Sequence, residues 1–266
     1  MALGSTGKSH KSLLGILYKR ALSEESRYWL YKMRHPGHFR HLRQRVSQHA
    51  KGDFSIQPFF EKKAIFVHIT KAAGTSTALS LFGALPSHYT AWQYRVIFGR
   101  KAFNRYFKFT FVRNPWDRLY SAYSFLRNGG WDEQDHRWAE QNLPDSDDFN
   151  DFVLNWMTPE KLYSHIHFWP QSRFVLDRNG KLLVDYIGYF ETIHEDFAEI
   201  AKRLDTDASL SHTNASPRMD YRSVYSSAAV QKVQELYRED IELFGYEFNG
   251  IKQKFANDIE NPGHGV

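Results

Sequence analysis

The chain has 266 residues, of which 42% are hydrophobic and 16% aromatic, a composition typical of a folded globular domain and not of a disordered chain. Its net charge of +5 and its pI near 9.2 favour anionic partners such as a nucleotide, an acidic glycan, a membrane surface or nucleic acid. The absence of cysteine excludes disulfides, thiolate metal sites and cysteine nucleophiles, and no apolar run reaches the roughly 18 residues of a membrane span.

The first 60 residues form a basic segment dotted with aromatic side chains. Amphipathic patterns over residues 13–22 and 28–46 predict a helical N-terminal arm over 1–60. Its histidines and arginines between residues 34 and 45 could contact a membrane or a charged acceptor, or form a solvated helical face. Because the apolar run at residues 13–17 is too short and too poorly flanked for the core of a signal peptide, we expect a cytoplasmic protein.

A buried strand, a loop and a helix start are predicted from residue 64 onward. The apolar run 64–70 is partly β-branched, and a Thr/Ser cluster able to cap a helix precedes residues 78–82. Free amides at a helix start, hydroxyl groups and a lysine ammonium can converge on one phosphate. The candidate residues are Lys71, Ala73, Gly74, Thr75, Ser76 and Thr77. An ordinary loop with a solvent-exposed lysine is the alternative, since the spacing of a P-loop ATPase is absent.

A second strand is predicted at residues 106–112, followed by a helix that Asn114 can cap and that Pro115 opens. This alternation of strands and helices favours an α/β fold with a parallel sheet. The side chains of Arg113 and Ser121 fall on one face of the second unit and could form a separate anion pocket. The alternative makes Arg113 a structural ion-pair residue and Ser121 an incidental helix serine.

The remaining chain predicts a hairpin and two further helices. Residues 173–177 and 181–187 flank Asn179-Gly180, a dipeptide typical of a two-residue hairpin turn. Helices are expected near 191–204 and 228–244, and the residues after Asn257 resemble a disordered end.

Two strings in this sequence resemble a known family. Lys71-x-x-Gly-Thr-Ser76 and Arg113-Asn-Pro-x-x-Arg-x-x-Ser121-x-Tyr123 are similar to the 5′-phosphosulfate and 3′-phosphate motifs of sulfotransferases that use 3′-phosphoadenosine 5′-phosphosulfate (PAPS), most closely the carbohydrate branch (sulfotransferase family 2). The resemblance implies a P-loop-like three-layer fold, with a mainly parallel central sheet flanked by helices. A sulfotransferase domain is then expected over residues 61–250, with a tail over 251–266.

The resemblance also implies a mechanism and assigns residue roles. The sulfuryl group of PAPS would pass in line to a hydroxyl of a carbohydrate or glycan-bearing acceptor, leaving 3′,5′-bisphosphoadenosine, with no metal required. Lys71 would steady the departing 5′-phosphate beside the amides of residues 73–77. Arg113 and Ser121 would hold the 3′-phosphate, and the loop containing Arg218 would close over the nucleotide.

An acceptor hydroxyl needs a base, and His88 is the candidate because related glycan sulfotransferases carry a base histidine between the two motifs. Glu191 is a lesser candidate, and His68 is expected to be packed. His165 and His167 could line the acceptor cleft. Their spacing also suggests a metal, but the sequence offers no third ligand at a suitable spacing, so no metal site is predicted.

Two other classes of function remain open from the sequence. An ATP-dependent small-molecule kinase would need a magnesium-binding carboxylate at the end of the second strand, where Arg113 stands instead. A non-enzymatic binder of acidic polymers is disfavoured because the basic residues are dispersed and no nucleic-acid motif is present, so nucleic acid is not expected as a partner. The oligomeric state is not predicted.

Overall fold

The computed structural model describes residues 24–48, 54–210 and 219–257. The helix expected over 13–22, the chain end after Asn257 and Arg218 therefore lie outside the described residues. The central feature is a sheet of three parallel strands in the order β1-β2-β3: β1 (Ala64–Val67), β2 (Phe107–Val112) and β3 (Tyr186–Tyr189). A short antiparallel pair, β4 (Tyr246–Glu247) with β5 (Gly250–Ile251), lies apart from it.

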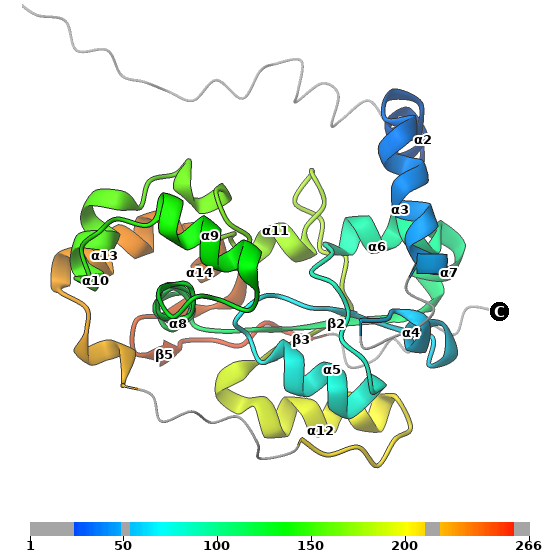
Figure 1. The fold of residues 1–266 in the computed structure, drawn as a ribbon. Coiled ribbons are helices and arrows are strands. Elements are labelled where there is room, and N and C mark those ends of the chain that lie inside the picture. Colours follow the sequence, from blue (N-terminus) through cyan, green and yellow to red (C-terminus); the bar gives the residue numbers. More distant parts are fainter. Residues whose placement is uncertain (1–23, 49–53, 211–218, 258–266) are drawn as a thin grey trace, which may run out of the picture.

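Helices surround this sheet, as the alternating sequence pattern predicted. In chain order the α-helices of the described residues are α2 (Glu24–Arg34), α3 (Pro36–Gln48), α4 (Gln57–Glu61), α5 (Gly74–Phe82), α6 (Ala91–Phe98), α7 (Arg100–Arg105), α8 (Pro115–Arg127), α9 (Glu133–Asn142), α10 (Phe149–Asp151), α11 (Ser172–Val175), α12 (Ile193–Arg203), α13 (Ser227–Leu236) and α14 (Arg238–Phe244). Figure 1 shows α5 and α12 on one side of the sheet, and α6 and α11 on the other. The chain is thus a mixed α/β protein.

The strands are short and apolar because both faces of the sheet are covered. Every residue of β1 and β3 is buried, and Phe66 on β1 stacks on Phe109 of β2 with ring centroids 5.1 Å apart. A second apolar cluster, which includes Trp116 and Val233, lies beyond the ends of the strands, where α8 packs against α13 and Nε1 of Trp116 donates a hydrogen bond to the Val230 carbonyl (3.0 Å). The two clusters hold α8 firmly at the edge of the sheet where β2 ends.

The predicted hairpin is wrong in its first strand. Residues 172–175 form helix α11, because the buried carboxylate of Asp240 accepts hydrogen bonds from the amides of Gln171 and Ser172 at the helix start (2.7 and 2.8 Å). Such a long-range cap outweighs local strand propensity. Only the turn is confirmed: Gly180 has a φ of +81°, and a single bridge joins Leu176 to Leu182.

Two long helical patterns are each divided in the structure. The pattern over 28–46 is split into α2 and α3 before Pro36, because proline disfavours a helical conformation of the preceding residue. The pattern over 228–244 breaks at Tyr237, whose φ is −109° and whose buried hydroxyl donates a hydrogen bond to the Phe168 carbonyl (2.7 Å).

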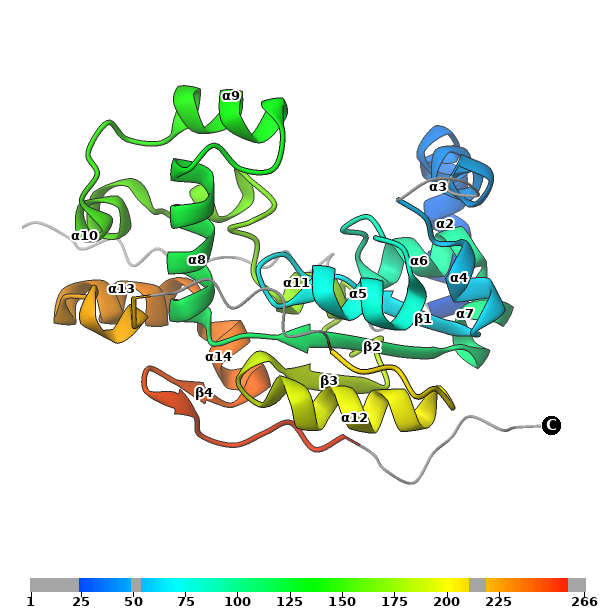
Figure 2. The same cartoon turned by 60° about the horizontal axis from the view of Figure 1, so that its bottom comes forward.

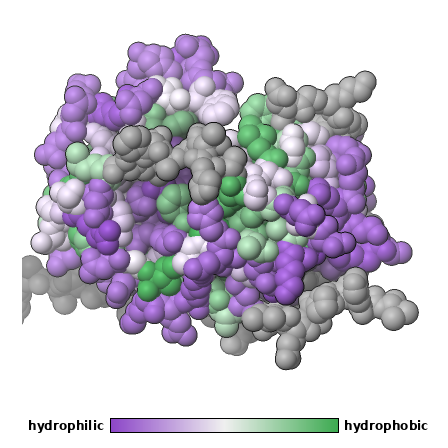
Figure 3. Space-filling model, turned by 90° about the horizontal axis from the view of Figure 1, so that it is seen from below, coloured by the Kyte–Doolittle hydropathy of each residue, from purple (hydrophilic) through white to green (hydrophobic). Residues whose placement is uncertain are grey.

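The N-terminal helices pack on the rest of the protein through α6. Leu42 of α3 is buried in the main core, and the Arg43 guanidinium donates a hydrogen bond to the Ile97 carbonyl (2.7 Å). None of the described helices is long and apolar enough to cross a membrane. Figure 3 shows one face of the molecule, on which hydrophilic residues predominate and hydrophobic residues lie in small patches.

Candidate functional site

The loops that follow β1 and β2 meet at one edge of the sheet. Both strands are parallel neighbours, so the predicted phosphate loop and the start of α8 leave the sheet at the same end, as Figure 2 shows. A direct contact joins them, because Nη1 of Arg113 donates a hydrogen bond to the carbonyl of Lys71 (3.1 Å). The two motifs recognised in the sequence therefore lie side by side in the fold.

The loop before α5 has an unusual backbone. Lys71 and Ala73 adopt left-handed conformations with φ of 64° and 60°, which strain a residue that carries a Cβ atom and often mark functional loops. Helix α5 begins at Gly74, earlier than predicted, and no side chain caps it. The amides of its first turn are thus left for another acceptor, while the Ser76 hydroxyl donates to the Ala73 carbonyl (3.2 Å).

The candidate phosphate ligands differ in accessibility. Thr75 and Ser76 are half-buried, but Thr77 is fully buried, and its hydroxyl has no hydrogen-bond partner among the described residues. Gly74 lies directly under the ring of His68: a Cβ atom built on it would come 1.7 Å from Cδ2 of that ring. His68 is therefore packed, as expected. Position 74 needs glycine because the His68 ring leaves no room for a Cβ atom.

Lys71 is positioned by helix α8. Its ammonium nitrogen lies 3.8 Å from the centre of the Phe125 ring, a cation–π distance. The same ring contacts His167 edge-on, with centroids 4.8 Å apart. Phe125 thus brings the lysine and a histidine from a distant segment to the same place.

Arg113 makes extensive contacts within the protein. It is 2% exposed, and its Nε and Nη2 bind the two carboxylate oxygens of Asp117 at 2.6 Å each. Its guanidinium also lies 4.3 Å from the Phe190 ring, just after β3. Ser121, one turn beyond Asp117 on α8, is half-buried. This geometry corresponds to the structural ion pair considered above, so a phosphate at this place would compete with Asp117.

The backbone around Arg113 is held by residues that are distant in the sequence. The side chain of Gln171 accepts a hydrogen bond from the Arg113 amide (2.9 Å) and donates one to its carbonyl (2.8 Å), while Asp240 fixes Gln171. Arg118, also buried, donates to the Thr70 carbonyl (2.9 Å) just before the phosphate loop. Gln171 and Asp240 therefore fix the backbone at Arg113, and Arg118 of α8 fixes the start of the phosphate loop.

His88 lies against His68, the residue that follows the end of strand β1. Its Nδ1 lies 2.9 Å from the His68 carbonyl, which accepts a hydrogen bond from the Nδ1–H group, so that Nε2 is the unprotonated nitrogen. Burial lowers the pKa of His88, so its ring is neutral at neutral pH. The helix expected near Thr90 is confirmed: α6 begins there with Thr90 and Gln93 in a capping box.

A cluster of three ionisable side chains lies beside Phe125. Nε2 of His165 is 3.2 Å from one oxygen of Asp135, and Nε2 of His167 is 3.9 Å from the other. Burial lowers the pKa of His167 to about 4, and the neighbouring His167 imidazole lowers the pKa of Asp135 to about 2. At neutral pH the histidines are therefore neutral and the carboxylate is charged.

The carboxylate of Glu191 is held by two hydrogen bonds within the protein. Its two carboxylate oxygens accept hydrogen bonds from the Asn114 amide (2.7 Å) and the Tyr246 hydroxyl (2.9 Å). Burial raises the pKa of the Glu191 carboxyl. Both oxygens are used to join α8 to the C-terminal strands.

The family of the chain is decided by a profile match. The model of the family described as "Sulfotransferase family" matches residues 86–247, more than half of the chain. This chain belongs to the sulfotransferase family. The matched segment of the sulfotransferase contains His88, Arg113, Ser121 and the Asp135 cluster, whereas the loop at Lys71 precedes it.

One relative of this sulfotransferase is similar in sequence. A protein of Archaeoglobus fulgidus, described only as uncharacterized, is 32% identical over 136 residues, which cover 50% of this chain and 98% of the relative. No solved structure matches. The family is thus established by the profile, while the donor and acceptor follow from neither comparison.

Sequence reasoning missed several residues of the sulfotransferase site. Asp117 could have been recognised, because it lies four residues after Arg113 at a spacing that favours a helical ion pair. Asp135 carried no such signal, since it is one of several acidic residues near the start of α9. No sequence pattern indicated Phe125 either, because it is one of 21 phenylalanines.

Proposed function

We propose that this sulfotransferase moves the sulfuryl group of PAPS to a hydroxyl of a carbohydrate or glycan-bearing acceptor. The observation that carries the proposal is the junction of the two anion-suited loops, joined by the hydrogen bond between Arg113 and the Lys71 carbonyl (3.1 Å). A donor with a phosphosulfate at one end and a 3′-phosphate at the other needs two anion sites a short distance apart. ATP, which has no 3′-phosphate, needs only one of them.

In the proposed reaction the acceptor oxygen attacks sulfur as the bond from sulfur to the 5′-phosphate oxygen breaks. Lys71 stabilises the charge that develops on that departing oxygen, and the amides and hydroxyls of residues 73–77 bind the other phosphate oxygens. Thr77 supports this loop indirectly, because its side chain is buried and its amide donates a hydrogen bond to the Ala73 carbonyl (3.3 Å). The group transfer itself needs no metal, since placement and charge stabilisation account for most of such a catalysis.

His88 receives the proton of the acceptor hydroxyl in this proposal. Its Nδ1 is held at the His68 carbonyl, which directs the free electron pair to Nε2. The lowered pKa keeps that pair unprotonated at neutral pH. A base fixed in one tautomer by a second group is the usual arrangement for activating a hydroxyl.

The 3′-phosphate is proposed to bind Arg113 and Ser121, with the loop carrying Arg218 closing over the nucleotide. Since Arg113 is paired with Asp117 at 2.6 Å, the phosphate must replace or share that carboxylate. An arginine fork suits either partner because both present two oxygens in one plane. Because the 3′-phosphate and the Asp117 carboxylate compete for the same guanidinium, the proposal predicts that Asp117 weakens donor binding.

A carbohydrate acceptor is supported by an exposed aromatic ring. Trp131 is 65% exposed and follows two glycines with positive φ at the end of α8. Its amide donates a hydrogen bond to Asp135 (2.9 Å), which places it beside the histidine cluster. Exposed indole rings offer an apolar face for sugar rings.

Cellular placement is a separate part of the proposal. We propose a cytoplasmic enzyme whose N-terminal arm can touch a membrane surface peripherally. Helix α2 exposes Trp29 and Met33 beside Lys32, the combination of apolar and cationic groups that favours such a surface.

Binding of 3′,5′-bisphosphoadenosine tests the donor class. At about 100 times its dissociation constant a ligand stabilises the native state by about 2.7 kcal/mol, which raises the unfolding temperature of a chain of this size by roughly 5–10 °C. We expect this shift without magnesium, and a smaller one with ATP. A shift with magnesium and ATP alone would favour a kinase, and no shift with either nucleotide would favour a binder of acidic polymers.

A further inference from the structure

The histidine pair of the sequence gains a third partner in the fold. The sequence offered His165 and His167 without another ligand, and the structure brings Asp135 to them from α9, some thirty residues away in the chain. One ligand atom from each residue lies within 4.8 Å of the other two. Among the described residues this is the group of histidines and carboxylates that meets the spacing of a metal site.

The distances fit a small divalent cation. Bonds of about 2.0–2.1 Å to zinc place neighbouring tetrahedral ligands about 3.3 Å apart. Nε2 of His165 and the nearer oxygen of Asp135 are already separated by 3.2 Å. Nε2 of His167 lies 3.9 Å from the second oxygen, so a small side-chain rotation completes the set.

A buried nitrogen of the cluster has no protein partner. His167 is 8% exposed, and its Nδ1 has no hydrogen-bond partner within the described part of the chain. Leaving a buried polar atom unsatisfied costs about 1–3 kcal/mol, so Nδ1 indicates a missing solvent molecule, while Nε2 is the nitrogen that faces Asp135 and can bind a metal. The contact of His165 Nδ1 with the His167 amide, at 3.4 Å, is too long to fix which nitrogen of that ring is protonated.

We propose that Asp135, His165 and His167 bind a divalent transition-metal ion of the zinc type. Two neutral imidazoles and one carboxylate are a donor set that zinc takes in proteins, with a fourth position left for water or a substrate oxygen. The ion ties α9 to the segment that leads to Gln171, which holds the backbone of Arg113. The metal thus stabilises the segment that holds the backbone of Arg113.

Charged groups around the cluster bear on the binding of a cation. Two further charges face the histidines: Lys71 near His167 opposes a cation, and Asp132 near His165 favours one. These two nearby charges have opposite signs, and the carboxylate of Asp135 supplies the negative charge that attracts the ion.

Metal binding is tested on the chelator-treated full chain with Zn²⁺ and Co²⁺. We expect one equivalent bound per chain in equilibrium dialysis, visible absorption bands of a four- or five-coordinate Co²⁺ ion, and a higher unfolding temperature. H165A, H167Q and D135N should each weaken binding by more than about 100-fold, beyond the loss that outer-sphere changes cause. Circular dichroism without metal establishes that each variant is folded.

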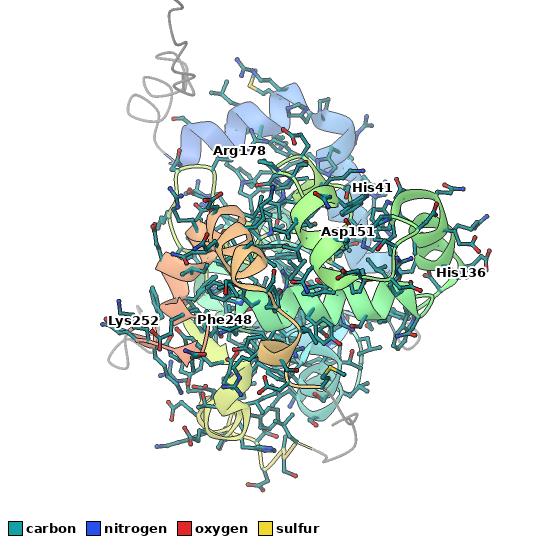
Figure 4. All side chains as sticks on the ribbon, turned by 90° about the vertical axis from the view of Figure 1, so that its left-hand side faces the viewer. His41, His136, Asp151, Arg178, Phe248 and Lys252 are labelled. Atoms are coloured by element: carbon teal, nitrogen blue, oxygen red, sulfur yellow. The ribbon has the colours of Figure 1, made fainter. Side chains whose placement is uncertain are left out.

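Two exposed histidines serve as matched controls. His136 is adjacent to Asp135 on α9 but binds Glu140, and His41 lies on α3 (Figure 4). H136A and H41A should bind metal like the original chain. Absence of stoichiometric binding, or equal binding by the cluster variants, would overturn the proposal. Because this assay uses neither donor nor acceptor, its result is independent of the proposed sulfuryl transfer.

Discussion

The pairing of Arg113 with Asp117 makes the 3′-phosphate contact directly testable. Arg113→Ala should weaken binding of 3′,5′-bisphosphoadenosine by about 2–4 kcal/mol, because a buried charge-assisted contact is lost. Asp117→Asn should instead strengthen it, since the competing charge is removed while the shape is kept. Calorimetric titration of 3′,5′-bisphosphoadenosine into each variant measures whether its binding is weakened or strengthened.

The outcome separates the two interpretations of Arg113. If its only role is the ion pair, both substitutions lower the unfolding temperature of the free protein and leave nucleotide affinity unchanged. Arg203, which pairs with Glu199 at the same helical spacing on α12, is the matched control, and Arg203→Ala should not alter nucleotide binding.

His88→Ala should leave nucleotide binding intact and lower the rate of transfer by about 10²–10⁴-fold, the usual contribution of a general base. The acid limb of the rate profile of the original chain should lie below pH 6.5, because burial lowers the pKa of His88 and the neutral ring persists at lower pH. Steady-state rates between pH 4 and 8 measure both effects. An alanine variant that remains active would mean that another group acts as the base.

The sequence selects Lys71 and Arg113 as candidate anion ligands because each follows a predicted strand. The structure places the two residues in contact through the Lys71 carbonyl. The partners of these cations were not predictable, since Phe125 and Gln171 reach them through tertiary packing. A sequence shows which groups can bind an anion, but it does not show which neighbours already occupy them.

The start of helix α5 depends on a close fit between Gly74 and His68. Gly74→Ala should lower the free energy of unfolding by about 1–3 kcal/mol, because the new Cβ would overlap the imidazole ring. It should also weaken nucleotide binding, since the loop at Lys71 must move. Chemical unfolding and nucleotide titration measure the two effects.

Two further substitutions control this experiment. Gly37→Ala on α3 meets nothing within 4 Å and should be neutral or slightly stabilising, as expected for alanine in a helix. Removing the ring in a His68→Ala background should restore part of the stability lost in Gly74→Ala. Equal losses in both backgrounds would mean that the contact is not the cause.

Elements were predicted where local pattern and burial agree. The strands β1 and β2 are short apolar runs, and α8 carries its own cap at Asn114, whose side chain accepts from the Trp116 amide (3.1 Å). Helix α11 was mistaken for a strand because its stabilising carboxylate, Asp240, lies far along the chain. Local patterns fail where a long-range contact decides the conformation.

The whole molecule is organised around the ends of three parallel strands. Lys71 follows β1, Arg113 follows β2, and Phe190, which contacts the Arg113 guanidinium, follows β3. The alternating sequence pattern was sufficient to predict this α/β arrangement, and the site at the strand ends stays a prediction. The family match over residues 86–247 adds the chemistry, because fold alone does not determine function.

Transfer of radiolabelled sulfate from PAPS tests the central claim most directly. The purified chain is supplied with labelled PAPS and a panel of soluble saccharides, and labelled product and 3′,5′-bisphosphoadenosine are quantified. We predict equal amounts of both, a loss of several orders of magnitude in Lys71→Ala, and no change in Lys161→Ala, whose ammonium also lies near an aromatic ring, 4.5 Å from that of Trp156. Unchanged turnover in Lys71→Ala, or no bisphosphate released from PAPS with any acceptor or with water, would contradict the account.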